Sequence, residues 1–192
     1  MQTGREKQLR VKLLKKLQEC LIYDPNHSIE LSSGRLSNFF IDCRRITLDN
    51  EGAFLTGSLI SDAISFEEPD AIGGVTLGAD PLVTSVGILT LKDPSPVPGF
   101  IIRKDPKPFT RPEDPSAFIE GNLKTGSRVV IVDDVLTTGN SLLQGIELVE
   151  KTGCTIIKIV ALVDRMEGAR EMLESKGYRV ESLFTVKDLL KT

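Results

Sequence analysis

The chain is poor in the residues from which metal sites and disulfide frameworks are built. Its 192 residues include a single histidine, His27, and three cysteines, Cys20, Cys43 and Cys154. One imidazole excludes any mechanism that needs two, and it excludes most zinc sites. The cysteines are widely spaced, odd in number and without a C-x-x-C pair, so we expect neither a disulfide framework nor a structural zinc site. Three mostly buried, reduced thiols indicate a cytoplasmic protein.

Long apolar runs and an excess of positive charge are absent as well. No stretch reaches the roughly 18 apolar residues that a membrane span needs, and charges interrupt the basic N-terminal segment, unlike a signal peptide. A net charge of −3 argues against a dedicated nucleic-acid-binding protein. The patterns G-x-x-x-x-G-K-[ST] and G-x-G-x-x-G do not occur, which disfavours P-loop and dinucleotide enzymes. We expect neither a membrane nor a nucleic acid as partner.

The residues that are present have the composition of one ordinary globular domain, with 40% apolar and 27% charged residues. From residue 71 onward, short apolar runs alternate with helical patterns. Strands are predicted over residues 71–75, 99–103, 128–132, 155–163 and 178–184, and helices over residues 80–91, 141–151, 166–176 and 187–190. Strands that are apolar on both faces and separated by helices predict an α/β fold, with a mainly parallel central sheet flanked by helices.

The first 45 residues depart from this alternation. Leucines recur every four positions from Leu9 to Leu21, which predicts an amphipathic helix over residues 5–20. A strand-like FFID segment follows at residues 39–42. We interpret residues 1–45 as a small hood that packs over one end of the sheet, within a single domain that comprises residues 1–192.

Prolines are concentrated in one segment. Seven of the ten lie between residues 93 and 116, and residues 104–118 mix prolines with charges and show no periodicity. Long irregular loops in compact domains are usually functional. We therefore expect residues 104–118 to form a mobile lid loop.

The most informative pattern is VVIVDDVLTTGNS at residues 129–141. A buried strand leads into two adjacent carboxylates, Asp133 and Asp134, and a turn then opens a helix. Ligands bind at the carboxyl ends of parallel strands, and backbone N–H groups at a helix N-terminus bind phosphate. Alone, the acidic pair is adequately explained as a solvated strand end, and the turn as a helix cap. Together they fit a sugar 5-phosphate, with carboxylates on the ribose hydroxyls and the turn on the phosphate.

Residues 129–141 resemble the 5-phosphoribosyl 1-diphosphate (PRPP) binding motif of type I phosphoribosyltransferases. Further segments narrow the resemblance to the orotate phosphoribosyltransferase family and extend it over nearly the whole chain: SSGRLSNFFID at 32–42, GGVTLGADPL at 73–82, IIRKDPK at 101–107, IEG at 119–121 and VDRMEG at 163–168. The resemblance implies the type I phosphoribosyltransferase fold and a glycosyltransferase of pyrimidine biosynthesis. The implied reaction is orotate plus PRPP giving orotidine 5′-phosphate and diphosphate, with Mg²⁺ carried by PRPP.

The resemblance also implies roles for individual residues. PRPP would be bound by Asp133, Asp134, Thr137, Thr138, Gly139, Asn140, Ser141, Thr76, Leu77 and Gly78. Orotate would be bound by Arg165, Phe40 and Ile41. Catalysis would depend on the lid cations Arg103, Lys104 and Lys107 beside Asp133 and Asp134. In the family such lid residues reach the active site of the neighbouring subunit, which implies a homodimer. No direct protein ligand of the metal is expected, although Mg²⁺ would lie near the acidic pair.

Some of these residues also have simpler explanations. Glycines around Gly78 allow a backbone to approach diphosphate closely, yet a tight strand-to-helix turn needs the same residues. The guanidinium of Arg165 suits a planar carboxylate, and an ion pair with Glu167 or Asp164 is its simpler explanation. Lid cations are commonly just solvated, and Phe40 can be an ordinary core aromatic residue.

The lid departs from the family pattern R-K-x-x-K-x-H-G. Phe109 stands where histidine is expected and Thr110 where glycine is expected, and prolines stiffen the remaining loop. Three hypotheses about the function follow, namely an orotate phosphoribosyltransferase with altered lid chemistry, a phosphoribosyltransferase for another base, or a PRPP-binding regulatory protein with impaired catalysis. Loss of a general acid or base costs about 10²–10⁴ in rate. The acidic pair, the phosphate turn at residues 137–141 and Arg165 are all retained, and they favour the first hypothesis.

Overall fold

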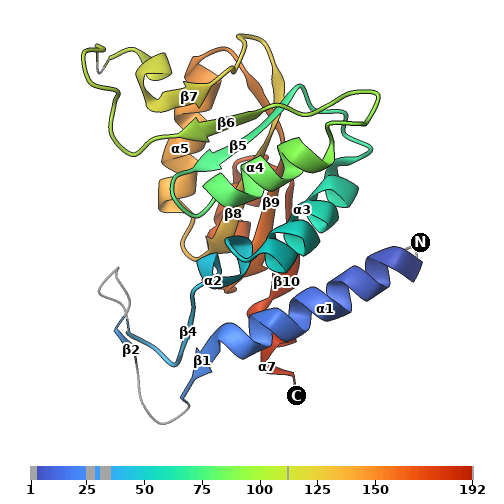
Figure 1. Cartoon of the computed structure of the whole chain (residues 1–192). Coiled ribbons are helices and arrows are strands. Elements are labelled where there is room, and N and C mark those ends of the chain that lie inside the picture. The colour runs from blue at the N-terminus through green and yellow to red at the C-terminus, as the bar shows by residue number, and fades with distance from the viewer. Residues whose placement is uncertain (1–3, 25–28, 31–35, 112, 192) are drawn as a thin grey trace.

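A six-stranded sheet forms the centre of the molecule (Figure 1). The computed structural model describes residues 4–24, 29–30, 36–111 and 113–191. The strand order is β10-β9-β8-β5-β6-β7, and every neighbouring pair is parallel except β6 with β7. The strands are β5 (Ala71–Val75), β6 (Gly99–Ile102), β7 (Ile119–Gly121), β8 (Arg128–Leu136), β9 (Thr155–Asp164) and β10 (Val180–Thr185). The predicted mainly parallel α/β sheet is confirmed.

Helices cover both faces of this sheet, because alternate strand residues point to opposite sides. Val130 and Val132 are buried in one apolar cluster with residues of α1, α3 and α4. Their neighbours Val129 and Ile131 are buried in a second cluster with residues of α5 and α6. The helices are α1 (Gly4–Cys20), α2 (Arg44–Thr47), α3 (Asn50–Ile64), α4 (Asp80–Leu89), α5 (Asn140–Lys151), α6 (Ala169–Ser175) and α7 (Val186–Leu190). None of these helices is long and apolar enough to cross a membrane.

The N-terminal helix α1 is joined to the main core. Its stripe of Leu9, Leu13 and Leu17 is buried in the same cluster as α3 and α4. The side-chain amide of Gln18 donates to the Leu189 carbonyl at 3.3 Å, so α1 lies along α7 (Figure 1). Beyond α1 lies a ribbon of β1 (Leu21–Tyr23) and β4 (Phe39–Ile41), together with the short pair β2 (Ile29–Glu30) and β3 (Leu36–Ser37).

Several predicted boundaries are wrong, most of them by one residue and those of α4, α6, β8 and β10 by two or more. Helix α6 begins at Ala169 and not at residue 166, because Met166 and Gly168 have φ values of 60° and 97°, outside the helical region. Strand β8 continues past Val132 to Leu136, since it keeps pairing with β9 as far as Asp164. Helix α4 ends at Leu89, two residues earlier than predicted. The extension of β8 places the acidic pair within the strand and not beyond its end.

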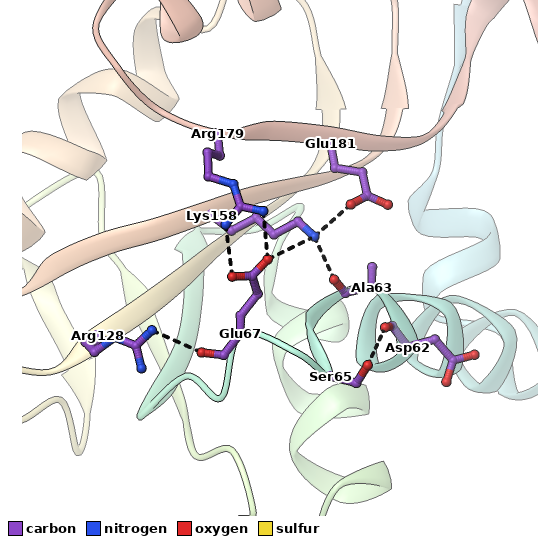
Figure 2. Close-up of polar contacts among 8 residues, drawn as sticks. All are labelled: Asp62, Ala63, Ser65, Glu67, Arg128, Lys158, Arg179 and Glu181. Carbon is purple, nitrogen blue, oxygen red and sulfur yellow. Dashed lines mark hydrogen bonds and ion pairs between the residues drawn. The ribbon is translucent and has the colours of Figure 1, made fainter. Parts of the chain in front are cut away.

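A cluster of ion pairs around Lys158 lies toward the amino ends of β9 and β10, and Figure 2 shows it. The buried ammonium of Lys158 donates to the Ala63 carbonyl at 2.7 Å and pairs with Glu181 at 2.7 Å and with Glu67 at 3.7 Å. Glu67 also accepts two hydrogen bonds of 3.0 Å from the guanidinium of Arg179. These contacts fasten the C-terminal end of α3 to strands β9 and β10.

Candidate active site

A cavity of about 910 Å³ opens at the carboxyl ends of β5, β6 and β8. This is the edge at which open parallel sheets bind ligands. Segments far apart in the sequence meet there, from β4 near residue 40 to the start of α5 near residue 141. Most predicted site residues line it: Phe40, Ile41, Thr76, Leu77, Gly78, Arg103, Lys104, Asp133, Asp134, Thr137, Thr138, Gly139, Asn140 and Ser141. Lys107 and Arg165 are not among the residues that line it.

The acidic pair lies in the wall of this cavity, on β8. The Oδ1 atom of Asp133 accepts a hydrogen bond of 3.0 Å from the backbone N–H of Asp134. Burial raises the pKa of Asp133 well above its ordinary value, and the neighbouring charge of Asp134 raises it further. Burial also raises the pKa of Asp134, which the positive charge of Arg44 partly offsets. The uncharged form of the pair is therefore favoured while the cavity is empty, and a bound cation would favour the ionised form.

The phosphate turn at residues 137–141 ends at the N-terminus of α5. Gly139 is the N-cap residue with a φ of 77°, a conformation that favours glycine. A Cβ at this position would lie 2.8 Å from the Met172 methyl group and 3.2 Å from the Ala169 Cβ. The first amides of α5 lack partners within the helix and lie where an anion can bind them.

The loop between β5 and α4 closes against the acidic pair. A Cβ on Gly78 would overlap the carboxyl group of Asp134, so only glycine allows this approach. The Thr76 hydroxyl donates to Oδ2 of Asp80 at 2.9 Å, which holds the loop to the first turn of α4. The Oδ1 atom of Asp80 is buried and has no hydrogen-bond partner among the described residues.

The lid leaves the sheet after β6 and returns through a short 3₁₀ helix, η1 (Pro115–Phe118), to β7. Its base is closed by hydrogen bonds from the Arg103 amide to the Phe118 carbonyl at 2.7 Å and from the Lys107 amide to the Ala117 carbonyl at 2.8 Å. Phe109 is fully exposed and has a φ of 66°. Lys104 lies close enough to Asp133 for its charge to lower the pKa of that carboxyl.

Arg165 lies behind the cavity wall. Its side chain is 4% exposed, and its Nε donates to Glu167 at 2.8 Å. The guanidinium carbon lies 4.2 Å from the centroid of the Phe39 ring, next in sequence to Phe40. The ion pair with Glu167, expected as the simpler explanation, is present; its arginine is buried, whereas the Glu167 side chain is 25% exposed.

Several cavity residues were not predicted individually: Asp42, Cys43, Arg44, Asp80, Asp105 and Glu120. Asp80 and Glu120 belong to the GGVTLGADPL and IEG motifs, whose likeness to the family was the available signal. Arg44 pairs with Asp42 at 2.8 Å directly after β4. Burial raises the pKa of the Cys43 thiol well above its ordinary value, and the charges of Asp134 and Asp42 raise it further, so the thiol is protonated at neutral pH.

Carboxyl groups outnumber cations in this wall. Six acidic side chains line the cavity: Asp42, Asp80, Asp105, Glu120, Asp133 and Asp134. Three basic side chains, Arg44, Arg103 and Lys104, face them. A phosphorylated ligand therefore needs added positive charge or the protonation of a carboxyl group before it binds tightly.

Fold and site define a class of protein. A parallel sheet with an acidic pair and a phosphate turn at its carboxyl edge is the arrangement that the type I phosphoribosyltransferase resemblance implies. A family model described as the phosphoribosyl transferase domain matches residues 62–182.

Individual relatives narrow this class. Orotate phosphoribosyltransferase of Aquifex aeolicus is 40% identical over 161 residues, which cover 84% of this chain and 86% of the relative. The enzyme of that name from Nostoc is 36% identical over 182 residues, covering 94% and 85%. A solved structure of Mycobacterium tuberculosis orotate phosphoribosyltransferase in complex with PRPP superposes with a TM-score of 0.76 at 31% identity, covering 94% of this chain and 98% of that one. The chain belongs to the orotate phosphoribosyltransferase family, and the predicted type I fold is confirmed.

Proposed function

We propose that this chain transfers the phosphoribosyl group of PRPP to orotate, giving orotidine 5′-phosphate and diphosphate, a step of pyrimidine nucleotide synthesis. One observation carries the proposal: the acidic pair, the phosphate turn, the Gly78 loop and two lid cations line a single cavity that also includes Phe40 and Ile41. A pentose phosphate, a diphosphate and a planar ring can each contact a matching part of this wall.

Each part of PRPP has a chemical partner in the cavity. Asp133 and Asp134 accept hydrogen bonds from the ribose hydroxyls, and residues 137–141 donate to the 5-phosphate. The backbone of residues 76–78 lies along the diphosphate, because Gly78 leaves room for it. The ring of orotate lies against Phe40 and Ile41.

The orotate carboxylate has Arg165 as its proposed partner. This guanidinium already contacts the ring of Phe39, beside the cavity-lining Phe40. Its present partner is the carboxylate of Glu167. Binding orotate would exchange one charge-assisted hydrogen bond for another, with a geometry that suits a planar carboxylate.

In the reaction, the bond between ribose C1 and the diphosphate oxygen breaks, and a bond between C1 and a ring nitrogen of orotate forms. That nitrogen loses its proton, which the departing diphosphate or solvent accepts. Positive charge develops on the ribose ring and negative charge on the departing diphosphate. Arg103, Lys104 and Lys107 stabilise the negative charge on the departing diphosphate more in the transition state than in the ground state, which lowers the barrier.

The donor set of the cavity fits Mg²⁺, because hard carboxylate oxygens are its preferred protein ligands. Mg²⁺ would be carried by oxygens of PRPP and would lie near Asp133 and Asp134. Bound Mg²⁺ supplies positive charge against the diphosphate in a wall where six carboxyl groups face three basic side chains. No three His, Cys, Asp or Glu side chains of the described residues are grouped as a metal site, so substrate oxygens would provide most of the coordination.

A homodimer and a cytoplasmic location complete the proposal. The dimer is supported by the family resemblance, in which lid residues serve the neighbouring subunit. The location is supported by three free cysteines, two of them buried, in a chain without disulfides among its described residues.

A different acceptor base, or PRPP binding without catalysis, is the alternative, and the fully exposed Phe109 in the lid is the observation that favours it. The test incubates the protein with Mg²⁺, PRPP and a panel of bases, and follows diphosphate release. Release with orotate alone supports the proposal, and release only with another base would contradict it. Tight PRPP binding without release for any base would identify a regulatory protein.

A further inference from the structure

One carboxylate in the cavity wall holds two of the three lid cations. Nη1 of Arg103 lies 3.0 Å from Oε1 of Glu120, and Nζ of Lys107 lies 3.7 Å from Oε2 of the same residue. The Nε of Arg103 donates to the Asp105 carbonyl at 3.0 Å, which fixes the direction of the guanidinium. The side chains of Arg103, Lys107 and Glu120 are 35%, 32% and 45% exposed, so a ligand can reach all three.

The sheet determines this arrangement. Strand β7 is antiparallel to β6, and Glu120 lies opposite Ile101. The side chain of Arg103 follows two residues later on the same face as Ile101, diagonally across from Glu120. Both Arg103 and Glu120 line the cavity, whereas Lys107 does not.

We propose that Glu120 is a positioning residue for the lid. Its carboxylate holds Arg103 and Lys107 while no diphosphate is bound, and a diphosphate group, in this cavity or in that of the neighbouring subunit, takes these cations from it during binding. Lys104 is not part of this arrangement, since its charge acts on Asp133. The inference rests on the proposed function for the identity of the anion, namely the diphosphate of PRPP or of the product.

A competition between two anions for the same cations has a measurable consequence. Wild-type protein must break two partly exposed ion pairs before Arg103 and Lys107 can meet diphosphate. Exposed pairs of this kind contribute about 0.2–1 kcal/mol each. For the two pairs together this converts to a factor of about two to thirty, so removing the charge of Glu120 should tighten diphosphate binding by about twofold to thirtyfold at low ionic strength, and less at high salt.

The experiment titrates inorganic diphosphate with Mg²⁺ into the full-length protein by calorimetry, at low and high salt. Glu120→Gln removes the charge and keeps the shape, and we expect its Kd to fall by about twofold to thirtyfold relative to wild type at low salt. Glu113→Gln is the matched control, because it removes the same charge from an exposed position in the same loop. Glu120→Asp keeps the charge, so we expect its Kd to lie closer to that of wild type than to that of Glu120→Gln.

Unchanged or weaker binding by Glu120→Gln would overturn the proposal, as would equal tightening by Glu113→Gln or by Glu120→Asp. The titration does not depend on turnover. If wild-type protein binds diphosphate but releases none with orotate, the proposed function fails while the role of Glu120 is still tested.

Discussion

At the scale of single residues, the close approach of Gly78 to Asp134 decides whether the loop between β5 and α4 can close against the acidic pair. A Cβ at Gly78 would overlap the Asp134 carboxyl group. We expect Gly78→Ala to weaken PRPP binding at least tenfold, measured by calorimetry. Gly87→Ala in α4 is the control, because its Cβ would have only an ordinary 3.7 Å contact with the Val97 carbonyl. Equal PRPP affinity of the two variants would argue against this role of the loop.

The raised pKa of Asp133 predicts that this residue lowers the stability of the fold at high pH although the proposed reaction depends on it. Burial raises this pKa in the folded protein above its unfolded value. The folded state therefore binds the proton more tightly, and the resulting stability is present at low pH and lost as pH rises through the folded pKa. We expect Asp133→Asn to melt at a higher temperature than wild type at pH 8, with a difference that shrinks toward pH 4, while turnover falls about 10–100-fold. A lower melting temperature than wild type at pH 8 would contradict this account.

Phe109 offers a test of lid chemistry. Its ring is fully exposed and its φ is 66°, so the fold gains little from the side chain. We expect Phe109→His to raise kcat with an unchanged melting temperature, because imidazole can exchange protons near neutral pH. Phe109→Asn is the control, since asparagine tolerates the same backbone conformation without titrating. An equal gain in both variants would assign the effect to the backbone.

At the scale of elements, helix α3 depends on the buried Lys158. Replacement by methionine leaves the Ala63 carbonyl and Glu181 without their partner and places Glu67 opposite Arg179 alone (Figure 2). We expect Lys158→Met to lower the free energy of unfolding by about 1–3 kcal/mol in urea denaturation. Lys187→Met, at an exposed position on α7, should change it by less than about 0.5 kcal/mol. Equal losses would show that the Lys158 cluster adds no stability.

The same scale shows what the sequence could predict. Strand β5 was predicted at its observed bounds, because a continuous apolar run between polar residues leaves little choice. Helix α3 was not predicted. Its buried face combines Leu55, Leu59, Ile60 and Ile64 with small and polar residues such as Gly52, Thr56 and Ser58, which blur the apolar stripe.

Site residues adjacent in sequence, such as Asp133 and residues 137–141, could be predicted because a single strand and turn position them. The pairing of Glu120 with Arg103 could not, since it depends on the register of two strands joined by the lid. The burial of Arg165 beneath Phe39 likewise depends on the packing of segments far apart in the sequence.

At the scale of the whole molecule, the ion pairs around Lys158 and the charged residues of the cavity lie toward opposite ends of the sheet and have different roles. Toward the amino ends, Lys158, Glu67 and Arg179 form closed ion pairs that hold elements together. Toward the carboxyl ends, an excess of carboxyl groups lines an open cavity, and a phosphorylated ligand needs added positive charge or a protonated carboxyl group to bind there tightly. The ion pairs at the amino ends of the strands thus stabilise the fold, whereas the charged side chains at the carboxyl ends can change partners when a ligand binds.

The most direct test of the central claim is to identify the product made from PRPP, Mg²⁺ and orotate by chromatography. We predict that wild-type protein forms orotidine 5′-phosphate and diphosphate in equal amounts, and that a protein carrying both Asp133→Asn and Asp134→Asn forms at least 100-fold less. Wild-type protein that binds PRPP and forms no orotidine 5′-phosphate, or a double variant as active as wild type, would contradict the account.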